Sequence, residues 1–274
     1  MSTLFTEAPA AKAETGNDFV GSHWYQYGTN GWEPLYEPGK TFTLREARKL
    51  SAEGRIVVPS VTTIFGVLAK PQLDKWKQEN VAKACWDQHR QSTAWEEQAW
   101  IDQALATASG ASKGAMDLGT RIHQAAEDYI AGKDYDATLA PYIEAIAAKR
   151  AAMGIRESVT EQCMGSARWG FAGRCDDHST QGMVIRDLKS RKSKGKKVPT
   201  YETDALQLSA YGAARWGNAF FQSGKGEIWA ISTSDPGLLT VHEFSGQDLV
   251  PAFECFLSLI KVWQHINNFK PNTQ

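Results

Sequence analysis

The chain has 274 residues, of which 42% are hydrophobic and 22% are charged, and this length suits one elaborated α/β domain with a sizeable core. It has no run of about 18 apolar residues, and its first residues lack a basic segment followed by an apolar core, so we expect neither a membrane span nor a secretory signal. The net charge of −1 does not favour a nucleic-acid binder, because many such proteins are basic overall. The four cysteines include no Cys-x-x-Cys pair. This disfavours structural zinc and iron–sulfur sites and predicts reduced thiols in a cytoplasmic protein.

The sequence predicts a short N-terminal tail followed by one domain. Residues 6–17 are small and polar, and we expect residues 1–18 to form a disordered tail. Within the single domain 19–274, residues 19–117 predict a hairpin and helical region, and residues 118–274 predict an α/β core. The dipeptide Asn30-Gly31 lies between aromatic residues and predicts the turn of the hairpin.

Helical patterns follow the hairpin. They cover 43–50, a segment after the apolar stretch 57–64, and 71–107. Thr43 is a candidate N-terminal cap for the first of these helices. Gly110 and Gly114 predict an interruption before the helix that carries His123.

The second half of the chain changes to strand patterns. After a helix at about 138–152, strands are predicted at 159–164, 168–175, 183–189, 226–232 and 239–244, and helices at 200–216 and 249–267. The order from residue 159 is therefore β-β-β-α-β-β-α. This pattern predicts one α/β core with a helical N-terminal elaboration rather than two independent domains.

Acidic and basic residues on neighbouring predicted strands suggest metal-dependent phosphate chemistry. Asp187 and Lys189 are two positions apart on one strand, so their side chains share a face about 6–7 Å apart. Asp176 is placed at the end of the preceding predicted strand. Two carboxylates suit Mg²⁺ or Mn²⁺, and His123 on the upstream helix offers a nitrogen ligand. Such a metal lowers the pKa of a bound water, while Lys189 adds positive charge beside a phosphate.

Each of these features also has an ordinary structural explanation. An isolated Asp-x-Lys is common on solvent-exposed strands, and a single histidine such as His123 on an amphipathic helix is more often structural. Gln207 and Tyr211 share one helix face, which a buried tyrosine with a polar neighbour would explain. The order and spacing of all the features together favour the nuclease interpretation.

In these motifs the chain resembles the PD-(D/E)XK nuclease superfamily, and within it the RecB-like exonucleases, including phage-encoded and mitochondrial genome maintenance exonucleases. The matching segments are Gly119-Thr120-Arg121-Ile122-His123, Gly173-Arg174-Cys175-Asp176, Asp187-Leu188-Lys189, Gln207-Leu208-Ser209-Ala210-Tyr211 and Pro59-Ser60-Val61-Thr62-Thr63-Ile64. The resemblance covers about residues 57–215. It implies a restriction-endonuclease-like core in which helices flank a central mixed sheet.

The resemblance also implies a role for each matching residue. Metal would be bound by His123, Asp176, Asp187 and the Leu188 carbonyl; Lys189 would be the catalytic lysine; Gln207 and Tyr211 would brace the site and contact DNA. Glu127 and Glu161 are further candidates, either to orient a ligand or to hold a second metal. Because Asp177 follows Asp176 directly, the ligand could instead be Asp177. The cysteines of the iron–sulfur branch are absent, so we expect Mg²⁺ or Mn²⁺ and no cluster.

A run of basic residues follows the catalytic strand. Seven basic residues and one acid lie between Arg186 and Lys197, and the predicted phosphate contacts are Arg191, Lys192, Lys194, Lys196 and Lys197. A solvated loop would also explain such a run.

The sequence as a whole predicts a DNA exonuclease acting on single strands or duplex ends in phage or bacterial DNA recombination, repair or processing. It would act in the cytoplasm of a bacterial cell or a phage-infected host, with DNA as partner, no membrane, and a recombination or single-strand-binding protein as a further partner. The alternatives are a structure-specific endonuclease and an inactive DNA-binding protein on the same fold.

Overall fold

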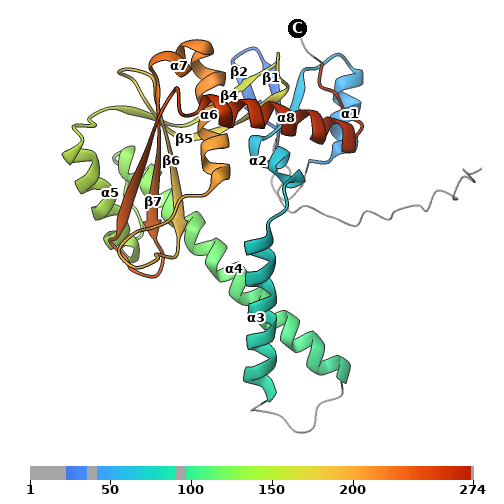
Figure 1. Ribbon diagram of the computed structural model, residues 1–274, viewed down its shortest axis with the longest axis vertical. Coiled ribbons are helices and arrows are strands. Elements are labelled where there is room, and N and C mark those ends of the chain that lie inside the picture. Colours follow the sequence, from blue (N-terminus) through green and yellow to red (C-terminus); the bar gives the residue numbers. More distant parts are fainter. Residues whose placement is uncertain (1–22, 36–41, 90–96, 273–274) are drawn as a thin grey trace, which may run out of the picture.

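The computed structural model describes residues 23–35, 42–89 and 97–272 (Figure 1). The predicted tail at 1–18 lies outside the described residues. The elements in chain order are β1 (Trp24–Gly28), β2 (Gly31–Pro34), α1 (Leu44–Ala52), β3 (Val57–Pro59), α2 (Val61–Ile64), η1 (Phe65–Val67), α3 (Pro71–His89), α4 (Glu97–Ile130), η2 (Ala137–Leu139), α5 (Ala140–Ala152), β4 (Ser158–Ser166), β5 (Phe171–Ser179), β6 (Val184–Arg191), α6 (Glu202–Trp216), α7 (Asn218–Ser223), β7 (Lys225–Ser232), β8 (Leu239–Ser245) and α8 (Val250–Ile266).

A five-stranded mixed sheet with the order β4-β5-β6-β7-β8 forms the centre of the α/β fold. Its neighbouring strands are antiparallel except β6 and β7, which are parallel. Along β7 the side chains alternate between two hydrophobic clusters. Ile228 and Ala230 pack in the cluster that includes α6 and α8, whereas Trp229 and Ile231 pack with α4 and α5. Helices therefore cover both faces, which confirms the prediction of a mixed sheet flanked by helices.

The N-terminal region forms a second, smaller sheet with the order β2-β1-β3. The predicted hairpin is confirmed, and Gly31 at its turn has a φ of 99°, which glycine adopts without steric cost. The predicted cap is also confirmed: Thr43 and Glu46 form a reciprocal capping box at the start of α1. A bridge from Ser60 to Ala172 joins the end of β3 to β5 and so connects the two sheets.

The structure corrects the prediction that Gly110 and Gly114 interrupt the helical region. Helix α4 runs through both glycines and packs against α3, and together the two helices extend away from the sheet (Figure 1). Glycine costs only about 1 kcal/mol relative to alanine within a helix. The seam between α3 and α4, which contains Ala84, Ala104 and Ala108, supports the helix across this stretch.

Two further differences concern the core. Strand β5 continues to Ser179, so Asp176 lies within a strand and not at its end, where the sequence pattern had placed it. A short helix, α7, follows α6 after Gly217, whose φ of 58° turns the chain between them. Among the described helices, none is both long and apolar enough to cross a membrane.

Candidate active site

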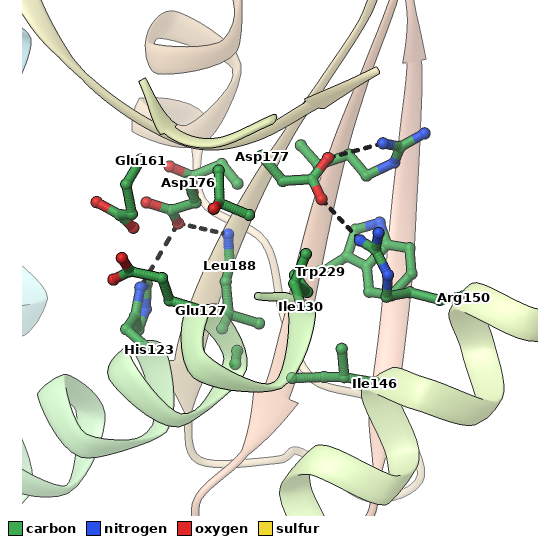
Figure 2. A pocket seen from close by; sticks show the side chains of 14 residues that line it. His123, Glu127, Ile130, Ile146, Arg150, Glu161, Asp176, Asp177, Leu188 and Trp229 are labelled. Carbon is green, nitrogen blue, oxygen red and sulfur yellow. Dashed lines mark hydrogen bonds and ion pairs between the residues drawn. The ribbon is translucent and has the colours of Figure 1, made fainter. Parts of the chain in front are cut away.

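The two acid-bearing strands separate at the candidate site. Over the described residues, β5 and β6 pair only through Asp177 with Arg186 and His178 with Ile185. Beyond that point the Leu188 N–H donates to Asp176 Oδ2 at 2.8 Å, so a side chain replaces the backbone partner (Figure 2). Because the N–H and C=O of a strand residue point to the same side, the Leu188 carbonyl faces the same gap.

Pairing is also broken on the other side of Asp176. Strands β4 and β5 pair at Thr160 with Asp177 and at Gln162 with Cys175, but Glu161 and Asp176 between them do not pair. Glu161 has a φ of 55°, in the left-handed region that non-glycine residues rarely adopt. Its carboxylate points toward Asp176 (Figure 2). Burial raises the pKa of Glu161 to about 7, and Asp176 adds to this effect while Arg174 opposes it.

Asp187 is the most enclosed acid of the site. Its side chain is 1% exposed, and its Oδ2 lies 2.6 Å from Lys189 Nζ. Although the two charges are paired, neither carboxylate oxygen accepts a well-directed hydrogen bond from any described residue. Burial raises the pKa of Asp187 despite the opposing effect of Lys189. A buried carboxylate with unused acceptor capacity is unusual and indicates a functional group.

His123, on α4, lies next to Asp176. Its Nδ1 lies 3.5 Å from Asp176 Oδ2. Burial lowers the pKa of His123, partly offset by Asp176, which favours the neutral imidazole that binds metals. Gly119 permits this approach, because a Cβ there would lie 2.6 Å from Ser190 Oγ on β6. Glu127, one turn later on α4, points toward the same group (Figure 2).

Two buried residues of α6 support Lys189 from the other face of the sheet. Lys189 Nζ donates to Gln207 Oε1 at 3.0 Å, and Gln207 Nε2 donates to the Tyr211 hydroxyl at 3.4 Å. Tyr211 lies directly against Gly173 of β5, where a Cβ would be 2.7 Å from the phenol oxygen. Burial raises the pKa of Tyr211 well above its ordinary value, so the phenol stays neutral. The contact with Tyr211 therefore explains why a glycine is present at this position of the Gly-x-x-Asp motif: a side chain there would collide with the tyrosine ring.

The structure separates the two adjacent acids Asp176 and Asp177. Asp177 is buried and accepts hydrogen bonds from Arg150 at 2.6 Å and from Arg186 at 2.7 Å, one on each carboxylate oxygen. Arg186 also bonds Glu227 at 3.0 Å. Asp177 is therefore occupied by two guanidinium groups, and Asp176 is the acid that faces His123.

The predicted metal ligands fit a divalent metal by their chemistry. The site offers carboxylates, a neutral imidazole and the buried Asp187 carboxylate without hydrogen bonds, and oxygen donors of this kind suit Mg²⁺ or Mn²⁺. Within the described part of the chain, however, no three His, Cys, Asp or Glu side chains converge as a ready-made metal-binding group. His123 and Asp176 pair with each other, and Asp187 pairs with Lys189.

The predicted DNA-binding residues divide into two groups. Arg191 donates to both carboxylate oxygens of Asp204, at 2.7 and 2.6 Å, and stacks over the ring of Tyr201. Its charge is therefore already paired with Asp204 in the first turn of α6. Lys192, Lys194, Lys196 and Lys197 are exposed on the loop between β6 and α6.

A groove opens beside the acidic residues. It has a volume of about 290 Å³ and runs between the N-terminal sheet and α4. Arg174 lines this groove two positions before Asp176 on the same strand, and it was not among the predicted site residues. The period of two along β5 was the available signal.

Comparisons with known proteins give little guidance. No protein-family model matches the chain, and no curated protein matches it. Among solved structures, the crystal structure of SSO0001 is similar at 14% identity, covering 66% of this chain and 85% of that chain, with a TM-score of 0.28.

Proposed function

We propose that this protein is a Mg²⁺- or Mn²⁺-dependent DNA nuclease with a PD-(D/E)XK core of the RecB-like type, and that it acts as an exonuclease on single strands or duplex ends. The observation that carries the proposal is the placement of Asp176 and Asp187 on strands that separate beside each other, with Lys189 paired to Asp187 and anchored by Gln207. The mixed sheet flanked by helices supports the proposed core.

The residues of the site have distinct proposed roles. His123, Asp176, Asp187 and the Leu188 carbonyl would hold the metal, which would supply an activated water and neutralise charge on the phosphate. Lys189 places a positive charge beside the scissile phosphate. Gln207 fixes the direction of the Lys189 ammonium group, and Tyr211 fixes Gln207.

A purely structural role for the site is less well supported. A structural ion pair gains from complete hydrogen bonding, because a buried carboxylate without it is costly. Asp187 has only the Lys189 ammonium, on one oxygen and without a well-directed hydrogen bond, whereas Asp177, buried between Arg150 and Arg186, has hydrogen bonds on both oxygens. The contrast favours Asp187 as a functional acid. We place the activity in phage or bacterial DNA recombination, repair or processing, with a recombination or single-strand-binding protein as a further partner.

Digestion of end-labelled DNA tests the proposal. Linear and closed circular DNA, single- and double-stranded, are incubated with Mg²⁺, Mn²⁺ or EDTA. We expect linear DNA to be degraded with either metal, circles to survive, and no cleavage in EDTA. Efficient nicking of circles would favour a structure-specific endonuclease, and binding without cleavage under every metal condition would favour an inactive DNA-binding protein.

A further inference from the structure

The groove beside the acidic site has a mixed polar lining. One wall carries His23 and Thr62 from the N-terminal region, and the other carries Thr120 and Gln124 from α4. These four side chains are exposed. Hydroxyl and amide groups of this kind commonly contact phosphate and sugar oxygens without reading bases. The groove reaches Asp176, so a molecule bound in it would extend to the proposed catalytic centre.

Arg174 is the guanidinium that lines this groove. It lies two residues before Asp176 on β5, so the two side chains share a face and their Cα atoms lie about 6–7 Å apart. Its Nε contacts Glu161 Oε2 at 2.5 Å, but the side chain remains 59% exposed. Among the described residues, its two terminal nitrogens have no partner, so the planar end of the guanidinium is available to a ligand.

The groove around Arg174 is acidic, so a bound phosphate would need a nearby positive charge. Glu127, Glu161 and Asp176 line the same groove and would repel a phosphate backbone. A guanidinium binds a phosphate with two parallel hydrogen bonds, which makes it effective beside such acids. Because Glu161 already holds the Arg174 Nε, the side chain is oriented before a phosphate arrives and less freedom is lost on binding.

We infer that this groove binds the sugar–phosphate backbone of a single DNA strand next to the scissile phosphate, and that Arg174 is its phosphate ligand. The inference rests on the proposed nuclease function and adds a substrate-binding residue to it. The volume of about 290 Å³ is just below the usual range of ligand pockets, which is about 300–1,000 Å³. A groove of this size suits one nucleotide of a single strand better than a base pair.

The test measures binding without cleavage. A fluorescein-labelled oligothymidylate is titrated in EDTA against wild type, R174A and R168A, at several salt concentrations. Arg168 is a matched control because it is an exposed arginine in the turn between β4 and β5. We expect R174A to weaken binding about tenfold and to reduce the log–log salt slope by roughly 0.7. R168A should change neither quantity.

Variants of Glu161 show whether Arg174 binds phosphate itself or only holds Glu161 in place. If Arg174 only holds Glu161, E161Q should weaken binding as R174A does. If Arg174 is a phosphate ligand, E161Q should bind the oligonucleotide as tightly as wild type or more tightly, and adding R174A in that background should again weaken binding about tenfold. Equal binding by E161Q and the double variant would overturn the inference, as would equal effects of R174A and R168A. Thermal melts of each variant identify any loss through unfolding, and R174K then provides a folded comparison with retained charge but without the planar fork.

A second DNA substrate and a second readout complete the test. A duplex closed by loops at both ends should bind more weakly than the single strand, and R174A should not affect its binding; an equal effect on both would overturn the single-strand assignment. With metal present, R174A should raise KM on single-stranded DNA more than it lowers kcat. If wild type cleaves nothing under any metal condition, the proposed function fails, whereas the binding result in EDTA still decides the role of Arg174.

Discussion

The Leu188 N–H and the Asp176 carboxylate are joined by a hydrogen bond of 2.8 Å across two strands that no longer pair there through their backbones. The bond fixes Asp176 beside the strand that carries Asp187 and Lys189. The neighbouring pair, Asp177 and Arg186, still belongs to the regular ladder. Of these two adjacent residues of β5, Asp176 therefore belongs to the candidate site, and Asp177 stabilises the sheet.

Substitution of these adjacent acids should have opposite effects. Asp176→Asn should abolish cleavage with little change in the free energy of unfolding, because a half-buried acid near other acids is replaced by a neutral side chain. Asp177→Asn should lower the free energy of unfolding by about 3–5 kcal/mol, because Arg150 would keep a buried charge without a carboxylate and Arg186 would keep only its bond to Glu227. Urea denaturation and nuclease assays on both variants check this. The assignment is wrong if Asp176→Asn cleaves DNA like wild type.

The bonds around Lys189 predict a graded series of activities. Lys189→Ala should lower kcat by about 100–1,000-fold, as expected for loss of a group that stabilises developing charge. Gln207→Ala should lower kcat about tenfold, because Lys189 would lose one orienting hydrogen bond. Tyr211→Phe should have the smallest effect, since its 3.4 Å contact is long for a hydrogen bond. Steady-state kinetics on single-stranded DNA would show the order, and a larger loss for Tyr211→Phe than for Gln207→Ala would contradict it.

The features predicted correctly from the sequence have local causes. The turn at Asn30-Gly31 and the cap at Thr43 depend on residues that are neighbours along the chain. The predicted break at Gly110 and Gly114 was wrong because the supporting contacts come from α3, a separate element. The end of β5 was misplaced for the same reason: Asp177 stays in the strand through its pairing with Arg186 on β6.

The site shows the same division between local and long-range information. The spacing of Asp187 and Lys189 along the sequence predicted that they share one face of a strand, and the structure places their charged atoms 2.6 Å apart. No short-range pattern indicated that Arg191 pairs with Asp204, because the two residues are separated by a loop and a change of element. Nor did the sequence distinguish Asp176 from Asp177. Their difference depends on Arg150 and Arg186, which approach from another helix and another strand.

The pairing of Asp204 with Arg191 predicts a pH-dependent contribution to stability. Burial raises the pKa of Asp204, but hydrogen bonds from Arg191 and the Tyr201 N–H outweigh it and hold the pKa below its ordinary value. The stabilisation should be complete above the unfolded pKa of about 3.9 and should be lost as the pH falls through the lower folded pKa. Asp204→Asn should cost about 3–5 kcal/mol at pH 7. Denaturation of wild type and variant from pH 7 to pH 3 should show the difference shrinking only below about pH 4, and a difference independent of pH would exclude this pair as its source.

The exposed lysines after β6 should contribute DNA affinity without contributing to chemistry. Neutralising Lys194, Lys196 and Lys197 together should weaken binding to all sequences alike. It should also flatten the salt dependence by roughly 0.7 in log–log slope for each lysine that no longer binds a single-strand phosphate. Turnover at saturating DNA should change little, because Asp187 and Lys189 lie on the strand and not on this loop.

A matched triple variant controls for the removal of three charges. Lys133, Lys149 and Lys261 are also exposed and belong to other parts of the chain. Their neutralisation should leave affinity for DNA near that of wild type, since screening at physiological salt limits the reach of exposed charges to about 8 Å. If both triple variants lose the same affinity, the effect reflects net charge alone. If neither does, the loop is only solvated, and the strand must reach the site along the groove that Arg174 lines.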